Sequence, residues 1–205
     1  MWGLTRMLTW WSQFNKKYHN IQVWAHHWGS LFSLSGIIGS TSSDMTGGGV
    51  DFLCLPTNPE WLSTSTSPSY ISWIGSVSYQ VSGYIFSSSV DDKRAWCAKC
   101  YTNSRPAVMM IPGRSSCPTY WTREYYGYLM ASQESLNHPS RYICVNNYPS
   151  YYSYSSPSYY QYSGYLTFVK ADCSGYATLD ECSSGEYQHG RVLTCVVCSR
   201  WSALS

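Results

Sequence analysis

The chain of 205 residues contains an internal repeat of about 95 residues, and this repeat restricts the possible folds more than any other feature. Residues 50–61 correspond to residues 140–151, and each half of the chain ends in a Cys-x-x-Cys motif. Because almost no linker separates the halves, we expect them to dock as one unit. The expected organisation is an N-terminal arm of unknown structure at 1–22, a first half-repeat at 23–104 and a second half-repeat at 105–205.

Strand patterns dominate the chain after residue 30. Between Ile71 and Val81 the odd positions are mostly apolar or aromatic and the even positions mostly polar, a period of two that is typical of a strand with one buried face. Clusters of Gly, Pro, Ser and Asn separate shorter runs of this kind. We expect strands at 50–55, 71–81, 107–111, 125–130, 141–145, 165–169 and 192–197. The sequence therefore predicts an all-β fold, while the Trp-rich residues 1–28 fit either a short amphipathic helix or an extended arm.

The composition excludes several classes of protein. Only 12% of the residues are charged and the net charge is +2, so no basic excess is present to neutralise a phosphate backbone. We therefore expect no nucleic-acid partner. No apolar stretch approaches the length of a transmembrane helix, so we expect no membrane partner. Aromatic residues make up 17% of the chain, which disfavours disorder.

The chain carries no recognisable catalytic constellation. Motifs of serine hydrolases, zinc proteases and phosphate-binding loops are absent from the sequence. The adjacent His26 and His27 would point to opposite faces of a strand, which is poor geometry for one metal ion. The acidic pair Asp91 and Asp92 is followed at once by two basic residues, a pattern more typical of a solvated turn than of a cation site. We expect no enzyme, no catalytic residue, no metal site and no cofactor.

Nine cysteines occur, none of them before Cys54. This number indicates an oxidising compartment, so we expect disulfides and a secreted, extracellular protein. A zinc site built from the two Cys-x-x-Cys motifs and a redox-active Cys-x-x-Cys are alternatives. Both are less favoured, because the motifs lie far apart and the second one falls in a strand-like run. No convincing signal peptide is found, since the apolar run at 7–11 is too short. We expect either a processed chain or a start that differs from that of the precursor.

A tyrosine-rich stretch without any charge spans Tyr148 to Tyr165. One interpretation is a surface loop and strand whose tyrosines cover apolar core. The other is a hydroxyl-rich contact surface for a glycan, a mineral or another chain. The candidate residues for such an assembly or ligand surface are Tyr151, Tyr152, Tyr154, Tyr159, Tyr160 and Tyr162.

Several motifs are familiar from one family of extracellular domains. They are Cys97–Cys100, Ala107–Pro112, Cys117–Trp121, Glu124–Met130 and the ending Leu193–Arg200. Together they resemble the junction and the end of the C-terminal non-collagenous domain of type IV collagen. The segment Leu53–Trp61 is closer still to the globular domains of sponge short-chain collagens and related secreted proteins of marine invertebrates. The resemblance covers about residues 29–200 and implies a duplicated, disulfide-stapled β fold that assembles into trimers or larger units.

The sequence departs from that family in three respects. It contains no Gly-x-y repeat, so this chain cannot form a collagen triple helix. Residues 1–22 have no counterpart. A Cys-Pro pair is expected near the start of each half, but it is missing around Ala25–Trp28 and present only at Cys117 and Pro118.

The resemblance and the repeat together imply a pattern of disulfides. In the second half the implied pairs are Cys117–Cys198 and Cys144–Cys195, with Cys173–Cys182 closing a small loop. The first-half equivalent of Cys144–Cys195 is Cys54–Cys97. The equivalent of Cys117–Cys198 would join Cys100 to a position near His26, where no cysteine exists. We therefore expect Cys100 to be free or to bond to another chain.

The leading hypothesis is a non-catalytic structural protein that self-associates in an extracellular matrix or skeletal element. Its expected partners are copies of itself or other matrix proteins. Sponges that secrete silica are among the animals that carry related domains. We therefore extend the hypothesis to biomineralisation, with a mineral as a further partner. The alternative is a lectin-like module, because Tyr and Trp stack on sugar rings while Ser and Asn bond to sugar hydroxyls.

Overall fold

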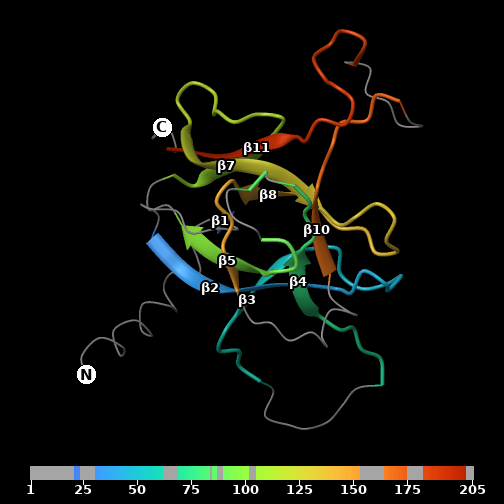
Figure 1. Ribbon diagram of the computed structural model, residues 1–205. Helices are drawn as coiled ribbons and strands as arrows, with labels where there is room; N and C mark the ends of the chain where they lie inside the picture. The colour runs from blue at the N-terminus through green and yellow to red at the C-terminus, as the bar shows by residue number, and fades with distance from the viewer. Residues whose placement is uncertain are drawn as a thin grey trace.

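The computed structural model describes residues 21–23, 31–61, 69–83, 85–86, 90–101, 105–152, 164–174 and 182–201 (Figure 1). None of these residues lies in an α-helix. The strands are β1 (Ile21–Val23), β2 (Leu31–Ser40), β3 (Leu53–Pro56), β4 (Gly75–Tyr79), β5 (Arg94–Tyr101), β6 (Ala107–Pro112), β7 (Thr122–Ala131), β8 (Ile143–Asn146), β9 (Tyr151–Tyr152), β10 (Gly164–Phe168) and β11 (Thr194–Arg200). The expected all-β class is confirmed.

The strands form one mixed, open sheet. Its main path runs β1-β5-β2-β4-β10-β7-β11-β6, while β3 pairs with β2, β8 with β7 and β9 with β5. All strand pairs are antiparallel except β4 with β10, which is parallel. The sheet therefore combines long-range pairings from the whole described chain.

Two groups of strands have the same pairings in the same register. In the first group β2 pairs with β3 and β5, and Gly36 lies opposite Cys97. In the second group β7 pairs with β8 and β11, and Gly127 lies opposite Cys195. The register shifts between Phe32 and Leu34 in the first group and at the matching point of β7 and β11 in the second. Strand β1 pairs antiparallel with β5 in the first group, and β6 pairs antiparallel with β11 in the second.

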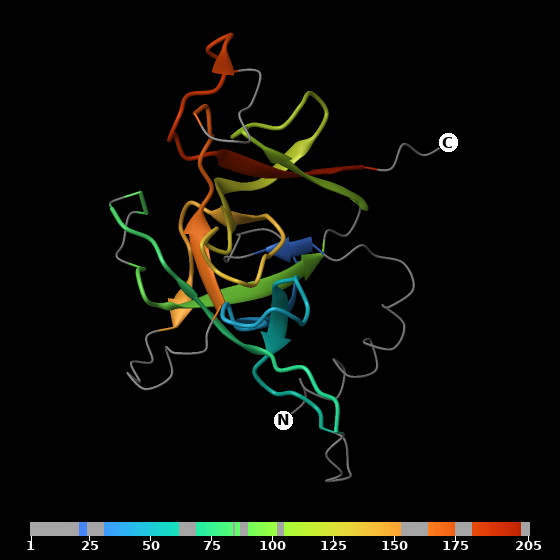
Figure 2. The same ribbon diagram turned by 90° about the vertical axis from the view of Figure 1, so that its right-hand side faces the viewer.

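The two groups are joined through β10 and β9. The first part of β10 pairs in parallel with β4, and its last two residues pair with β7. Figure 2 shows β10, in orange, running between the part of the sheet with β7 and β11 and the part with β4 and β5. Strand β9 pairs with the start of β5, and the hydroxyl of Tyr79 donates a hydrogen bond to the Ser150 carbonyl oxygen at 3.2 Å. Strands of the second half therefore extend the sheet of the first half.

The largest buried cluster lies where these strands meet. Side chains of Ile38, Val77, Tyr79, Met130 and Leu166 are fully buried in it. Aromatic rings add a chain of contacts in which Phe86 packs on Tyr79, Tyr128 and Phe168 with centroid distances of 6.1, 5.5 and 5.1 Å. The contacts of Phe86 with Tyr79 and Tyr128 are edge-to-face, and such contacts favour one arrangement of the strands beyond the general gain from apolar burial.

The expected strand at 71–81 is partly wrong. The strand begins only at Gly75, and Ile71 and Trp73 lie exposed in the preceding loop. The apolar Val77, Tyr79 and Val81 are buried as expected, but Ser78 between them is buried as well, so burial does not alternate along this strand. The other six expected strands are present with shifted ends, whereas the strand patterns had not indicated β1, β2, β5 or β9.

Gly127 gives a direct test of the β7–β8 packing. A Cβ atom at this position would lie 1.8 Å from the Val145 carbonyl oxygen, and backbone cannot move away as a flexible side chain can. We expect Gly127→Ala to lower the free energy of unfolding by about 3 kcal/mol or more, measured by denaturant titration. The control is Gly47→Ala, because Gly47 has no atom within 4 Å of such a Cβ. An equal effect of the two substitutions would contradict the close approach.

Candidate functional site

Two disulfides each tie together the two strands that flank a central strand. Cys54–Cys97 joins β3 to β5, and both strands pair with β2. Cys144–Cys195 joins β8 to β11, and both pair with β7. The Cα atoms are 5.7 and 5.6 Å apart, within the normal range for a disulfide. A glycine of the central strand, Gly36 or Gly127, lies opposite the second cysteine of each pair, where a Cβ would collide with backbone.

The other two disulfides fasten loops of the second half. Cys117–Cys198 ties the connection between β6 and β7 to β11, with Cα atoms 5.9 Å apart. Cys173–Cys182 closes a loop in which the two cysteines are nine positions apart. All four pairs are those that the resemblance implies. Each removes freedom from the unfolded chain, which stabilises a fold by roughly 2–4 kcal/mol per bridge.

Cys100 is the free cysteine, and it is buried. All nine cysteines lie among the described residues, and the other eight form the four disulfides. Only 3% of Cys100 is exposed, in a cluster with Tyr125 and Leu129. Burial raises the pKa of the Cys100 thiol, and the Glu124 carboxylate raises it further. Because the thiolate is the reactive form, Cys100 is closed to chemistry with another chain in the folded protein.

We expect the Cys100 thiol to resist iodoacetamide in the native protein at neutral pH. Mass spectrometry should show no adduct on the folded chain and one adduct per chain once the protein is unfolded without reductant. Rapid alkylation of the native protein would contradict the buried position. Alkylation of more than one cysteine in the unfolded, unreduced chain would contradict the four disulfides.

A buried ionic group lies next to Cys100. The Glu124 side chain is 4% exposed, lies at the register shift of β7 against β11, and accepts hydrogen bonds from Arg105 at 3.0 Å and from the Ser199 hydroxyl. Ser199 is fully buried. Arg105 precedes β6, so this group fixes the start of the second half against β7 and β11. Sequence reasoning missed it, because an isolated Glu in an aromatic strand gives no signal of burial.

The buried and the exposed carboxylate should differ in their effect on stability. Glu124→Ala leaves the Arg105 guanidinium without this partner in a mostly buried place, and we expect a loss on the order of 3 kcal/mol. Asp51→Ala removes an exposed ion pair with Arg141 and should cost less than about 1 kcal/mol. Thermal and denaturant unfolding of both variants measures the difference. Equal losses of unfolding free energy in the two variants would contradict a stabilising role of the buried Glu124 group.

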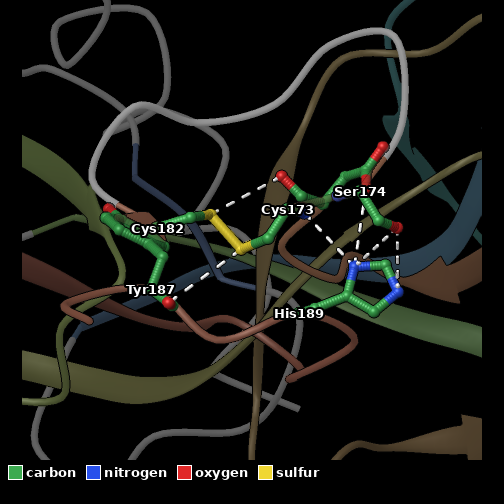
Figure 3. The surroundings of a disulfide bond; sticks show 6 residues. Cys173, Ser174, Cys182, Tyr187 and His189 are labelled. Carbon is green, nitrogen blue, oxygen red and sulfur yellow. Dashed lines mark hydrogen bonds and ion pairs between the residues drawn. A yellow bond between two sulfur atoms is a disulfide. The ribbon is translucent and has the colours of Figure 1, made fainter. Parts of the chain in front are cut away.

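A Ser, a His and an Asp meet beside the Cys173–Cys182 disulfide (Figure 3). The His189 Nδ1 atom lies 3.5 Å from Asp172 Oδ1, and it accepts a hydrogen bond from the Cys173 backbone N–H at 3.2 Å. The Ser174 hydroxyl lies beside the ring, 3.3 Å from Nδ1 and 3.4 Å from Nε2. In a catalytic triad the carboxylate and the hydroxyl bind opposite ring nitrogens. Here the Ser174 hydroxyl lies almost equally far from both ring nitrogens, so it is not directed at Nε2 alone as a triad hydroxyl is.

A hollow of about 310 Å³ opens between two segments from different halves. The segments are held side by side by His138, whose Nε2 lies 3.0 Å from the Gly49 carbonyl oxygen, and by the Arg141 N–H, which donates to Val50 O at 3.1 Å. An ion pair of 2.7 Å between Arg141 Nε and Asp51 borders the hollow. Its lining residues are Asp51, Phe52, Leu53, Arg141, Tyr142 and Ile143. These come from equivalent stretches of the sequence repeat.

The connection between β3 and β4 carries several of the most exposed aromatic side chains of the described chain. We name its described residues, 57–61 and 69–74, the aromatic loop. In Figure 1 its described parts, in teal, lead away from the sheet at the bottom of the view. Trp61 is 85% exposed and Trp73 is 76% exposed, and neither lines the hollow. The exposed apolar residues of the loop are Trp61, Tyr70, Ile71, Trp73 and Ile74.

The predicted tyrosine surface is only partly described. Tyr151 is 38% exposed and lies in β9, opposite Ala95 of β5. Tyr152 lies opposite Arg94 in the same pairing. The remaining candidates Tyr154, Tyr159, Tyr160 and Tyr162 lie outside the described residues. The start of this stretch is therefore docked on the first half as a short strand.

Within the described ranges, no group of three or more His, Cys, Asp or Glu side chains lies close enough together to hold a metal ion. That part of the chain also contains no helix that could span a membrane. Comparison of the sequence and the structure with protein-family models, curated proteins and solved structures found no match.

Proposed function

We propose that this protein is a secreted, non-catalytic structural protein that self-associates in an extracellular matrix or skeletal element. The observation that carries the proposal is the aromatic loop. Large apolar patches on a soluble domain mark interaction surfaces, and here Trp61, Trp73 and Tyr70 are mostly exposed. No Asp, Glu, Lys or Arg occurs between Trp61 and Val90, so charge repulsion does not oppose contact through this surface.

The four disulfides support the extracellular location. Such bridges persist in oxidising compartments and are typical of extracellular proteins. They also suit a structural role, because they hold the fold when the protein is diluted or mechanically loaded. The buried Cys100 leaves non-covalent contacts as the means of association between native chains.

We also propose that the chain consists of two related half-domains in tandem, organised as in the C-terminal domain of type IV collagen. The equal registers around Gly36 and Gly127 support a duplication, as do the two equivalent strand-crossing disulfides. The pairing of β10 with β4 supports tight docking of the halves. A duplicated fold suits assembly, because equivalent surfaces occur twice.

The alternative function is a carbohydrate-binding module. Exposed Trp61 and Trp73, with Ser and Thr between them in the sequence, are residue types that stack on and bond to sugars. A mineral partner is a further extension of the structural proposal, since hydroxyl-rich surfaces can bond to surface silanols.

Solution mass at several concentrations separates the two functions when it is combined with a glycan array. The structural proposal predicts an average mass that rises with concentration and no specific glycan signal. A monomer at all concentrations that binds one class of sugar with sub-millimolar affinity would overturn the proposal in favour of the lectin-like module.

A further inference from the structure

The aromatic loop and the hollow are complementary features on one molecule. The hollow has a mixed lining, in which Phe52, Leu53 and Ile143 supply apolar surface and the remaining residues supply polar surface. Its volume of about 310 Å³ is at the lower end of the range for small-ligand pockets. It therefore has room for one or two large side chains rather than for an extended ligand. The aromatic loop presents such side chains, Trp61 and Trp73, to solvent.

The rim of the hollow suits an aromatic ring in particular. Tyr142 is 63% exposed, so its ring is available for stacking. The ion pair uses Nε of Arg141, and this side chain is 72% exposed, which leaves the face of the guanidinium open. A guanidinium favours the face of Trp above other rings. Because Arg141 is already paired with Asp51, the rim carries little net charge and suits an uncharged partner.

The described residues of the aromatic loop do not fill the hollow of the same chain. Trp61 and Trp73 remain mostly exposed, and neither belongs to the lining. The hollow lies at the start of β3, beside Leu53, whereas the aromatic loop follows the end of β3 at Pro56. The exposed Trp61 and Trp73 side chains are therefore not part of the hollow of their own chain.

We propose that the aromatic loop of one copy inserts Trp61 and Trp73 into the hollow of a second copy. This contact rests on the proposed self-association and specifies its geometry. The two surfaces that meet are different, so the contact is head-to-tail. Each added copy presents a new loop and a new hollow, and a rotation that does not close gives a filament rather than a closed dimer.

Two double variants test the contact. The loop variant is Trp61→Ser with Trp73→Ser, and the hollow variant is Leu53→Ser with Tyr142→Ser. All four residues are exposed or partly exposed, so the fold should persist, which near-ultraviolet circular dichroism and thermal unfolding check. The control is Trp201→Ser, which removes an exposed Trp outside both surfaces.

Analytical ultracentrifugation reads the assembly of each protein and of mixtures. We expect wild type and control to form chains of increasing mass, and each double variant to stay monomeric with a dissociation constant raised at least about tenfold. An equimolar mixture of the two variants should form a two-chain complex and stop there. That complex retains only one functional loop and one functional hollow, and these are used in its single contact.

The outcomes separate this contact from self-association in general. Assembly of either double variant as strong as that of wild type would refute the loop–hollow contact and leave self-association standing. A mixture that stays monomeric would refute the contact as well. A wild-type protein that remains monomeric at every concentration would overturn both the contact and the proposed function.

Discussion

The fold depends on the close crossing of neighbouring strands at two glycines. At Gly36 and Gly127 a Cβ atom would lie less than 2 Å from a backbone carbonyl oxygen of the adjacent strand, Leu55 or Val145. This close approach brings β3 and β5, which flank β2, within disulfide distance of each other. It does the same for β8 and β11, which flank β7. The disulfides Cys54–Cys97 and Cys144–Cys195 then lock each crossing. The main apolar clusters form around these crossings, since one contains Cys54 and Cys97 and the other contains Cys144 and Cys195.

The two strand groups, one around β2 and one around β7, differ at the end of their last long strand, β5 or β11. In the second half Cys198 of β11 is bonded to Cys117. The residue at the matching register of β5 is Cys100, which is buried without a bond. Glu124 lies near both, and its bonds to Arg105 and Ser199 anchor the connection between the halves. A buried thiol therefore lies at the position in β5 that corresponds to the bridged Cys198 of β11, and the ionic group of Glu124 lies beside this thiol.

The sequence patterns predicted the all-β class and seven of the strands, and the family resemblance together with the repeat implied the cysteine pairs. Alternation at Val77, Tyr79 and Val81 marked one strand because each of these side chains faces the core. The sequence pattern did not indicate strand β5, because Arg94 and Lys99 interrupt its apolar residues. Both side chains are only partly exposed in the fold. The hollow could not be predicted at all. It depends on how two segments about 90 residues apart meet, and such tertiary contacts leave no local pattern.

The most direct test of this account is a map of the disulfides in the native protein. The protein is alkylated, digested at acidic pH without reduction, and its cross-linked peptides are identified by mass spectrometry. The account predicts peptides that join Cys54 to Cys97, Cys144 to Cys195, Cys117 to Cys198 and Cys173 to Cys182, with Cys100 in a peptide that is not cross-linked. A peptide that joins Cys100 to any other cysteine, or one that joins Cys54 or Cys97 to the second half, would contradict it.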